Sequence, residues 1–299
     1  MKERQTAGFI SAEQSFDMGY LLTTNGGFLR SSGHIFSQSA QLGFGSATFS
    51  TTLNAGAIRF DPDPSHNRFF VGGPGTVDVY NATTLAVIQS ITGFSGQIIG
   101  ICCDEGNNRV FAFSSAHGYI IDGSTLGITL SVAFDGENFS NSCYDPVSNT
   151  VWVPSYYKNK LYVLAADTLT EKVRISDGPS GPGCLSLDPV AANNRVVLGN
   201  YGAHNIITYD RSTYLRTFTY PAPGAINDIF WDPDPQKNRM YAALNGGGLA
   251  VFDAGTFGLI ANLSLGSGDL YASIDPVAAN KRILAAYQNF GISVVPVPG

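Results

Sequence analysis

The chain has 299 residues, a formal net charge of −6 and a sequence pI of about 5.1. This acidic balance, with no run of Lys or Arg longer than two, excludes the clustered basic surface that nucleic-acid binding needs. Charged residues make up 13%, about half the usual share for a soluble domain, and there are 34 Gly, which is typical of an all-β protein of short strands and tight turns.

The sequence contains neither a membrane span nor an export signal. No apolar run approaches the ~18 residues that a membrane helix needs. The opening MKERQTAGFISAEQSFD lacks the apolar core of a secretory signal. Unless a leader has been removed, we expect synthesis in the cytoplasm and no membrane segment. The final location stays open, and incorporation into a virion or a surface assembly is one alternative.

The first predicted strand comprises residues 5–11, QTAGFIS, whose apolar residues alternate with small or polar ones. A second predicted strand, residues 19–23, is followed by Thr24-Asn25-Gly26-Gly27, a strong signal for a tight β-hairpin. Residues 27–56 align without a gap on residues 110–139, which belong to a regular repeat. We therefore predict a first, degenerate repeat copy at residues 17–53.

From residue 55 onward the chain repeats every 41 to 44 residues. In each copy an acidic residue ends the first strand, Pro follows it in five of six copies, and Asn-Arg usually comes next. Pro fixes φ and Asn tolerates turn geometry, so this is the turn into the second strand. An Asp-x-x-Thr signature marks the turn from the third to the fourth strand. The acidic anchors are Asp61, Asp104, Asp145, Asp188, Asp232 and Asp275.

Each copy reads as four short strands, and seven copies fill the chain as one closed object. The last copy stops after its third strand, so pairing residues 5–11 with residues 292–297 would complete it and remove an open sheet edge. An open β-solenoid is the alternative, but it needs capping segments that the sequence lacks. The expected fold is all-β: a seven-bladed β-propeller of four-stranded antiparallel blades, its ring closed by an N-terminal strand that completes the last blade.

We expect a single β-propeller domain over residues 1–299. Its predicted segments are the closing strand at 5–11 and blades at about 17–53, 54–95, 96–136, 137–179, 180–223, 224–267 and 268–299.

The repeat resembles the YVTN-type β-propeller repeats, and the resemblance covers essentially the whole chain. It implies a propeller scaffold but no particular chemistry, because the class includes surface-layer proteins, lactonase-like enzymes and binding proteins. The Trp231-Asp232 dipeptide looks like WD40 but stands at the wrong strand and lacks a Gly-His partner. The residues that match best are Asp188, Pro189, Asn194, Arg195, Asn200, Gly202, Asn205 and Asp210.

All four cysteines, Cys102, Cys103, Cys143 and Cys184, fall in predicted first strands. First strands line the buried centre of a propeller, so we expect small buried thiols. A disulfide between Cys102 and Cys143 is the alternative, which a reducing compartment disfavours. No C-x-x-C motif supports a zinc ribbon.

Chain direction divides the loops between two faces. The Asp-Pro and Asp-x-x-Thr turns lie on one, here called the turn face, and they are nearly uniform. The loops from strand two to three and from strand four to the next copy lie on the other, here called the loop face, and they differ between copies. Variable loops on a rigid scaffold are where binding usually resides. The predicted binding residues of the loop face are Tyr156, Tyr157, Lys158, Tyr201, His204, Tyr287, Asn289 and Phe290.

Flat amphipathic rings beside amide groups suit a sugar or a protein loop, although rim packing is the simpler alternative for each ring. Polar residues of the loops from strand four to the next copy are predicted to lie at the channel mouth, where their oxygen atoms could hold a divalent cation. No other cofactor is predicted. These residues are Asn54, Gln97, Glu137, Asn138, Asn227, Asp228 and Asp269.

The expected function is a non-enzymatic recognition module that binds a glycan or protein partner on the loop face. One alternative is a structural component of a larger assembly, such as a virion or a cell-surface structure. A second alternative is a metal-dependent hydrolase or lyase at the channel mouth. No catalytic residues are predicted, because the sequence has no nucleophile elbow and no P-loop, and its four His stand in different copies.

Overall fold

The computed structural model describes residues 20–22, 28–30, 48–50, 55–176, 180–265, 268–287 and 291–297. The chain divides into two compact units, Met1–Ile35 and Phe36–Gly299. In the first unit, β1 (Tyr20–Leu22) pairs antiparallel with β2 (Phe28–Arg30), with Leu21 opposite Leu29. This pairing confirms the hairpin predicted from the Asn-Gly-Gly signal. No helix in the described part of the chain is long and apolar enough to cross a membrane.

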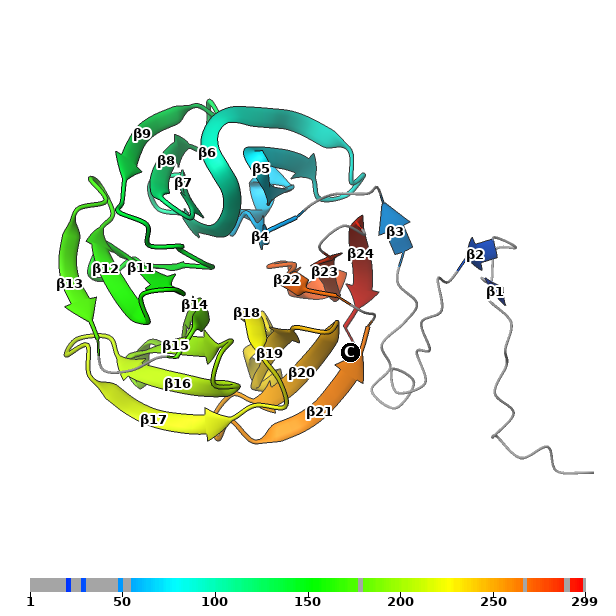
Figure 1. Cartoon of the computed structure of the whole chain (residues 1–299). Coiled ribbons are helices and arrows are strands. Elements are labelled where there is room, and N and C mark those ends of the chain that lie inside the picture. The colour runs from blue at the N-terminus through cyan, green and yellow to red at the C-terminus, as the bar shows by residue number, and fades with distance from the viewer. Residues whose placement is uncertain are drawn as a thin grey trace, which may run out of the picture. The chain divides into compact units, whose positions relative to one another are not determined.

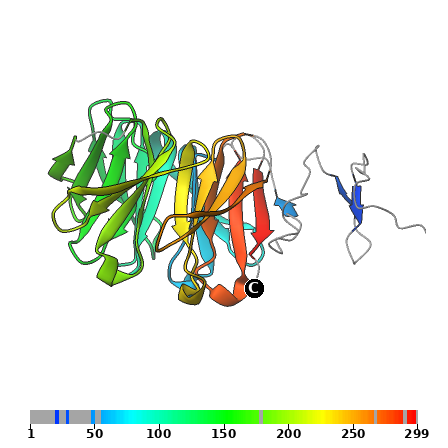
Figure 2. The same ribbon diagram turned by 90° about the horizontal axis from the view of Figure 1, so that it is seen from below.

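The second unit is a ring of short antiparallel strands (Figure 1), and seen edge-on its strands run between the two faces (Figure 2). Its elements from the first two copies are β4 (Ala57–Phe60), β5 (Arg68–Asn81), β6 (Val87–Asp104), β7 (Arg109–Ser114), β8 (His117–Asp122) and β9 (Ile128–Ala133). Next come β10 (Cys143–Asp145), β11 (Thr150–Ser155), β12 (Lys160–Ala165), β13 (Glu171–Ile175), β14 (Pro182–Leu187), β15 (Arg195–Asn200), β16 (Asn205–Asp210) and β17 (Arg216–Pro221). The last are β18 (Ile226–Trp231), β19 (Arg239–Leu244), β20 (Gly248–Asp253), β21 (Leu259–Ser264), β22 (Leu270–Ile274), β23 (Arg282–Tyr287) and β24 (Gly291–Pro296).

The prediction of seven four-stranded blades is wrong. The described ring has five hydrogen-bonded sheets: β10 to β13, β14 to β17, β18 to β21, β22 to β24 with β3, and a six-stranded sheet of β4 to β9. The copies anchored at Asp61 and Asp104 share the six-stranded sheet because β5 and β6 each continue from one strand position of the repeat into the next. Among the described residues, the copy predicted at residues 17–53 contributes the two-stranded sheet of β1 and β2 and the short strand β3 (Thr48–Ser50), which joins the last sheet, rather than a four-stranded blade.

The ring is closed by β3 (Thr48–Ser50), which pairs with β24 in the last sheet. Ser50 lies opposite Ile292, and Thr48 lies opposite Val294. The sequence analysis gave this position to residues 5–11, which lie outside the described residues. That assignment is wrong, because β3 occupies the backbone edge of β24 at residues 292–294. A strand from the N-terminal side does complete the last sheet, but it is a different strand.

The first strands of neighbouring copies approach each other backbone to backbone. A Cβ at Gly100 would overlap the carbonyl of Ser140, and one at Gly183 would overlap the carbonyl of Ile226. Leu185 N donates directly to Asn141 O in the preceding copy, at 2.9 Å. Glycine at these positions therefore lets the inner strands close around a narrow centre. Second and third strands carry the core, as in β11, where every residue is buried.

The structure has turns at the Asp-Pro and Asp-x-x-Thr positions that the sequence predicts. Four of the Asp-Pro turns contain a short 3₁₀ segment: η1 (Pro64–His66), η2 (Ala191–Asn193), η3 (Pro235–Lys237) and η4 (Ala278–Asn280). Three of these segments end at an Asn with left-handed backbone, such as Asn194 at φ 46°. Asn tolerates this conformation better than most residues, which explains its place in the repeat. At the third turns, the Asp122 carboxylate accepts the backbone N–H of Thr125 at 2.7 Å, and this bond lowers the pKa of Asp122.

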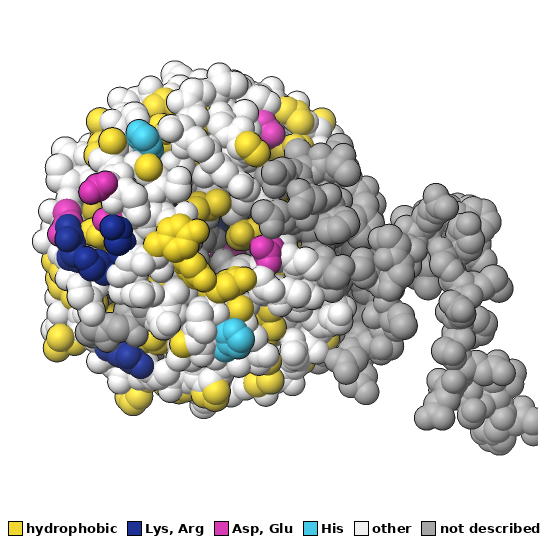
Figure 3. Space-filling model, in the orientation of Figure 1, with side chains coloured by type: hydrophobic (Ala, Val, Ile, Leu, Met, Phe, Trp, Pro, Cys, Tyr) yellow, Lys and Arg dark blue, Asp and Glu magenta, His cyan; other side chains and the backbone are white. Residues whose placement is uncertain are grey.

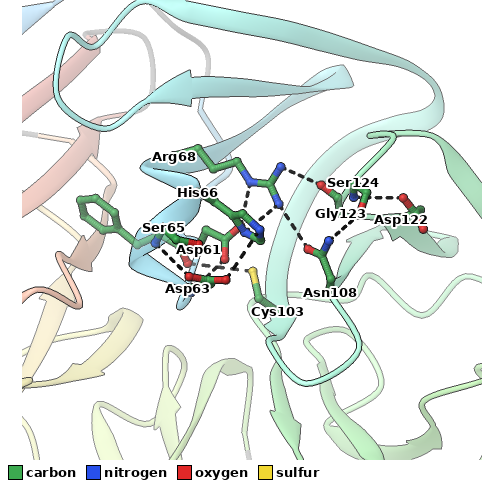
Figure 4. A network of polar contacts seen from close by, with 11 residues as sticks. Asp61, Asp63, Ser65, His66, Arg68, Cys103, Asn108, Asp122, Gly123 and Ser124 are labelled. Carbon is green, nitrogen blue, oxygen red and sulfur yellow. Dashed lines mark hydrogen bonds and ion pairs between the residues drawn. The ribbon is translucent and has the colours of Figure 1, made fainter.

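A buried aspartate–arginine pair, here called the Asp–Arg clamp, recurs in four copies. Arg68 Nε donates to Asp61 Oδ2 at 2.7 Å, while Asp61 Oδ1 accepts the N–H of Asp63 at 3.0 Å (Figure 4). The guanidinium of Arg68 also reaches the next copy, where it donates to Gly123 O at 2.7 Å. The pair therefore fixes one turn and ties two copies together. The other clamps are Arg109–Asp104, Arg195–Asp188 and Arg282–Asp275.

The copy anchored at Asp232 departs from this pattern. Tyr241 Oη donates to Asp232 Oδ2 at 2.8 Å, and so takes the oxygen that Arg Nε takes in the clamps. Arg239, which stands at the clamp position, forms no ion pair within the described part of the chain.

We expect removal of β3 to destabilise the ring. A variant lacking residues 1–50 should have a lower free energy of unfolding than one lacking residues 1–47, by on the order of 2 kcal/mol, because it loses the ladder hydrogen bonds to β24. Urea denaturation of both variants measures the difference. The two variants differ only in the three residues of β3, so equal unfolding midpoints would contradict the assigned closure.

We also expect an arginine of the Asp–Arg clamp to contribute more to the free energy of unfolding than Arg239, which forms no clamp. Arg195→Gln should lower the free energy of unfolding by about 3 to 5 kcal/mol, because it leaves the buried carboxylate of Asp188 without its cation. Arg239→Gln should lower it by less than about 1 kcal/mol, because no carboxylate depends on Arg239. Denaturant titration compares the two variants with the parent, and equal losses would argue against the clamp.

Candidate recognition surfaces

Three tyrosines from neighbouring copies meet on the loop face, as ring closure predicts. The ring centroids of Tyr156 and Tyr157 are 5.4 Å apart at 69°, and those of Tyr156 and Tyr201 are 5.6 Å apart at 78°. Both are edge-to-face contacts, a favoured geometry for aromatic pairs. Tyr157 is 71% exposed, whereas Tyr156 and Tyr201 are half-buried. We call these three residues the tyrosine patch, and Figure 3 shows hydrophobic side chains gathered near the centre of this face.

Neighbouring loops hold the patch in place. Gly181 lies between the two half-buried tyrosines, where a Cβ would stand 2.9 Å from the Tyr156 ring, and its φ of +62° also favours glycine. Its carbonyl accepts the N–H of Tyr201 at 2.9 Å. On the other side, Asn245 Nδ2 donates to Tyr201 Oη at 2.8 Å and also to Asp269 Oδ1. Contacts with neighbouring loops therefore fix the positions of the tyrosine rings.

The pKa of the Tyr201 hydroxyl is raised, first by burial and then by the nearby Asp269 carboxylate and Tyr156. Tyr201 therefore stays neutral at physiological pH, and its oxygen is engaged by Asn245. Of the other predicted loop-face residues, Lys158 and His204 are exposed. Tyr287 is described in its backbone alone, where it pairs with Leu270 and Gly291. Asn289 and Phe290 lie outside the described residues.

Three residues predicted to form the channel mouth have side chains that are hydrogen-bonded or buried. Glu137 Oε2 accepts the hydroxyl of Ser155 at 3.0 Å, on the second strand of its own sheet. Asp269 bonds to Asn245 at the tyrosine patch, while Asp228 is fully buried. Among the residues that the structure describes, no group of three or more His, Cys, Asp or Glu side chains is arranged to hold a metal ion.

The structure describes three further residues of the predicted channel mouth. Gln97 lies in β6 opposite Pro74, and its side-chain amide is close to Gly56. Asn138 has left-handed backbone at φ 49° and bonds through its main chain to Ser115 and Tyr156. Asn227 is 6% exposed, and Asn54 lies outside the described residues. That these side chains share one site at the channel mouth stays a prediction.

An ion pair that the sequence analysis missed crosses the centre of the ring. Arg59 of β4 extends past β22 to Asp228 of β18, with Nη2 and Oδ1 3.2 Å apart, and its Nε donates to Ile101 O at 3.2 Å. Asp228 is fully buried, and burial raises the pKa of its carboxyl to about 6 although Arg59 opposes the rise. A cation within a buried first strand was the available sequence signal, since small or apolar residues fill most positions there.

The cysteines surround this ion pair as unreactive thiols. All four are free, and Cys102, Cys143 and Cys184 are buried. Burial raises the pKa of Cys102 to about 12, and burial raises the pKa of Cys143 and Cys184 as well. A thiol that stays protonated is a poor nucleophile. The prediction of buried free thiols is therefore confirmed for these three cysteines, whereas Cys103 is free and half-buried.

A cavity of about 520 Å³ opens on the turn face, opposite the tyrosine patch. Turns from four copies surround it, and Arg59, Ser186 and Ser273 lie among its lining residues. Trp231 lines it too and donates through Nε1 to Ser186 Oγ at 3.0 Å. Because its loops are uniform, the sequence analysis assigned no binding to this face. The residue that could have signalled the cavity is Trp231, which was set aside only as a failed WD40 match.

Comparison with known proteins supports the fold alone. No protein-family model matches the chain, and no curated protein does either. Solved structures match in large number, 1750 chains in all, so the architecture is widespread. One is titled "Crystal Structure of Mitotic Checkpoint Complex": it has a TM-score of 0.61 and 12% sequence identity, and the match covers 78% of this chain and 72% of that chain. The chain thus has a β-propeller fold, and the YVTN resemblance stays a prediction.

The pKa of Asp228 gives the fold a pH dependence with a definite sign. Its folded value of about 6 lies above its ordinary value of 3.8, so its contribution to stability is present at low pH and is lost as pH rises through about 6. We expect the parent to lose stability relative to Asp228→Asn between about pH 4 and pH 7. Denaturant unfolding of both proteins across this range measures the difference, and a constant difference would contradict the assignment.

Proposed function

We propose that this chain is a non-enzymatic recognition module that binds a protein partner through the tyrosine patch. The observation that carries the proposal is the exposure of Tyr157, 71%, on top of two tyrosines that are themselves held by neighbouring loops. Tyrosine offers a large amphipathic contact area at low conformational-entropy cost, which is why it dominates many binding surfaces. Exposed aromatic clusters on a rigid scaffold commonly mark interaction sites.

The surroundings of the patch favour a polypeptide. Asn245 and Asp269 supply hydrogen-bonding groups beside Tyr201, so a bound segment could pair its backbone there while apolar side chains pack on Tyr157. An apolar centre with a polar rim is the usual anatomy of an interface. Basic side chains lie toward one edge of this face (Figure 3), and Lys158, next to Tyr157 in the sequence, is exposed.

A larger assembly is the second candidate, and one observation favours it. Most of the exposed large hydrophobic side chains lie on or beside fourth strands, at the outer wall of the ring, where another copy or another protein could cover them. They are Val87, Ile88, Leu215, Phe218, Leu259 and Ile260, all 49% exposed or more.

We expect Tyr157→Ala with Tyr201→Ala to abolish binding to a polypeptide partner and to leave the melting temperature nearly unchanged. Buried aromatic anchors cost about 2 kcal/mol or more when truncated at an interface. Candidates would be selected from a peptide-display library against the parent protein and then measured by calorimetry. Phe218→Ala, which removes a 64% exposed ring from β17, is the matched control and should bind like the parent.

Full binding by the double variant would refute the tyrosine patch as the site. A glycan array run in parallel identifies a sugar ligand, which would replace the polypeptide in this proposal. Native mass of the parent separates the two candidates, because a stable higher oligomer that Phe218→Ala dissolves would favour the assembly.

A further inference from the structure

The cavity on the turn face has the size and lining of a small-molecule site. Its volume of about 520 Å³ falls within the roughly 300 to 1,000 Å³ of ligand pockets. Phe60, Trp231 and Ile274 give it apolar walls, and the prolines of four Asp-Pro turns, such as Pro233 and Pro276, stand around them. Lining of this kind, with a few polar groups among apolar side chains, is typical of sites that bind flat apolar molecules.

Arg239, one of three arginines that line this cavity, has no carboxylate partner among the residues that the structure describes. In the clamps the equivalent arginine holds Oδ2 of its aspartate, for example at 2.5 Å between Arg195 Nε and Asp188. At Asp232 the hydroxyl of Tyr241 takes Oδ2 at 2.8 Å, and the N–H of Asp234 takes Oδ1 at 3.0 Å. Tyr241 is the only tyrosine at its position in the six copies, so the displacement of Arg239 is particular to this copy.

The other charged groups of the cavity are already engaged. Arg59 pairs with Asp228. Arg195 pairs with Asp188, donates to Ala254 O at 2.7 Å and packs against the rings of Trp231 and Phe257. The Asp234 carboxylate caps η3 by accepting the N–H of Gln236 at 3.1 Å. Arg239 is hydrogen-bonded to the Tyr241 side chain but forms no ion pair among the described residues, so its positive charge can still pair with an incoming anion.

We propose that the turn-face cavity binds a small organic acid with a planar apolar body, its carboxylate paired with Arg239 and its flat body against Trp231. The planar guanidinium fork matches a carboxylate with two parallel hydrogen bonds, which adds direction as well as strength. The indole and proline walls match an aromatic or other flat hydrocarbon. This site lies on the face opposite the tyrosine patch and does not depend on it.

The test uses naphthalene-2-carboxylate and its uncharged counterpart naphthalene-2-carboxamide, titrated into the full chain. The two tryptophans give the readout: Trp152 is fully buried in β11, whereas Trp231 lines the cavity, so quenching reports binding there. We expect the acid to bind at least about tenfold more tightly than the amide, because the ionic hydrogen bonds form with the acid alone.

Variants then assign the difference to one residue. Arg239→Gln should remove the preference for the acid, and Arg239→Lys should retain part of it, because Lys keeps the charge but loses the fork. Arg216→Gln is the matched control, since Arg216 lies on exposed β17 beside Thr219, and it should bind like the parent. Tyr157→Ala should also leave acid binding unchanged, which separates this site from the proposed function.

Three results would overturn the proposal. One is the absence of saturable quenching by the acid up to about 5 mM, a concentration that would occupy most of a site with a Kd of about 1 mM. Another is equal affinity for acid and amide. The third is an Arg239→Gln protein that melts like the parent and still prefers the acid. If the Gln variant does not fold, an Arg239→Lys protein that keeps the parent's full preference for the acid would overturn the proposal instead.

Discussion

The interaction on which the ring depends is the buried aspartate that ends each first strand. Its carboxylate is 9% exposed or less in all six copies, and a charge so placed is costly unless it is fully hydrogen-bonded. In five of the copies it accepts the N–H two residues further on, as Asp188 accepts that of Val190, and so shapes the turn. In four copies an arginine neutralises it and also reaches the next copy. The anchor aspartate thereby links the geometry of its own turn to the packing between neighbouring copies. In a repeat protein, such contacts between neighbours carry stability from one copy to the next.

This dependence explains why the turn face is uniform and also where it can change. A copy that loses the arginine must supply another donor to the aspartate, because a buried carboxylate without one would destabilise the sheet. At Asp145, Ser148 Oγ donates at 2.6 Å and Arg211 of the next copy lies 3.4 Å away. At Asp232, Tyr241 is the donor. The second solution leaves Arg239, which lines the cavity with Trp231, bonded to Tyr241 and without an ion pair in the described part of the chain, while Asp232 stays buried.

The sequence predicted local structure well and ring closure poorly. Anchors, turns and the tyrosine patch follow from spacing, because each depends on a few residues close in sequence or at the same position in adjacent copies. The number of sheets does not, because continuity of β5 and β6 is a matter of backbone pairing that the repeat period cannot reveal. The closing strand was misplaced because a strand of three residues is enough to complete the last sheet. Thr48–Ser50 is too short to be recognised as a strand from its sequence pattern. The cavity was missed because uniform loops were taken to mean an inert face, and the central ion pair because Arg59 and Asp228 are 169 residues apart.

The closing strand and the central ion pair act at the same seam. The chain passes from β3 in the last sheet to β4 in the first, so the covalent connection crosses the junction where the ring begins and ends. Two residues of β4 strengthen that junction: Phe60 N donates to Ser273 Oγ at 3.1 Å in β22, and Arg59 reaches beyond β22 to Asp228. Opening the ring at this seam would therefore leave the Asp228 carboxylate without its cation, a state that is costly while the group is buried. Protonation of Asp228 lowers that cost, since a neutral acid needs no cation. The seam is thus a part of the ring whose opening is coupled to the charge of the Asp228 side chain.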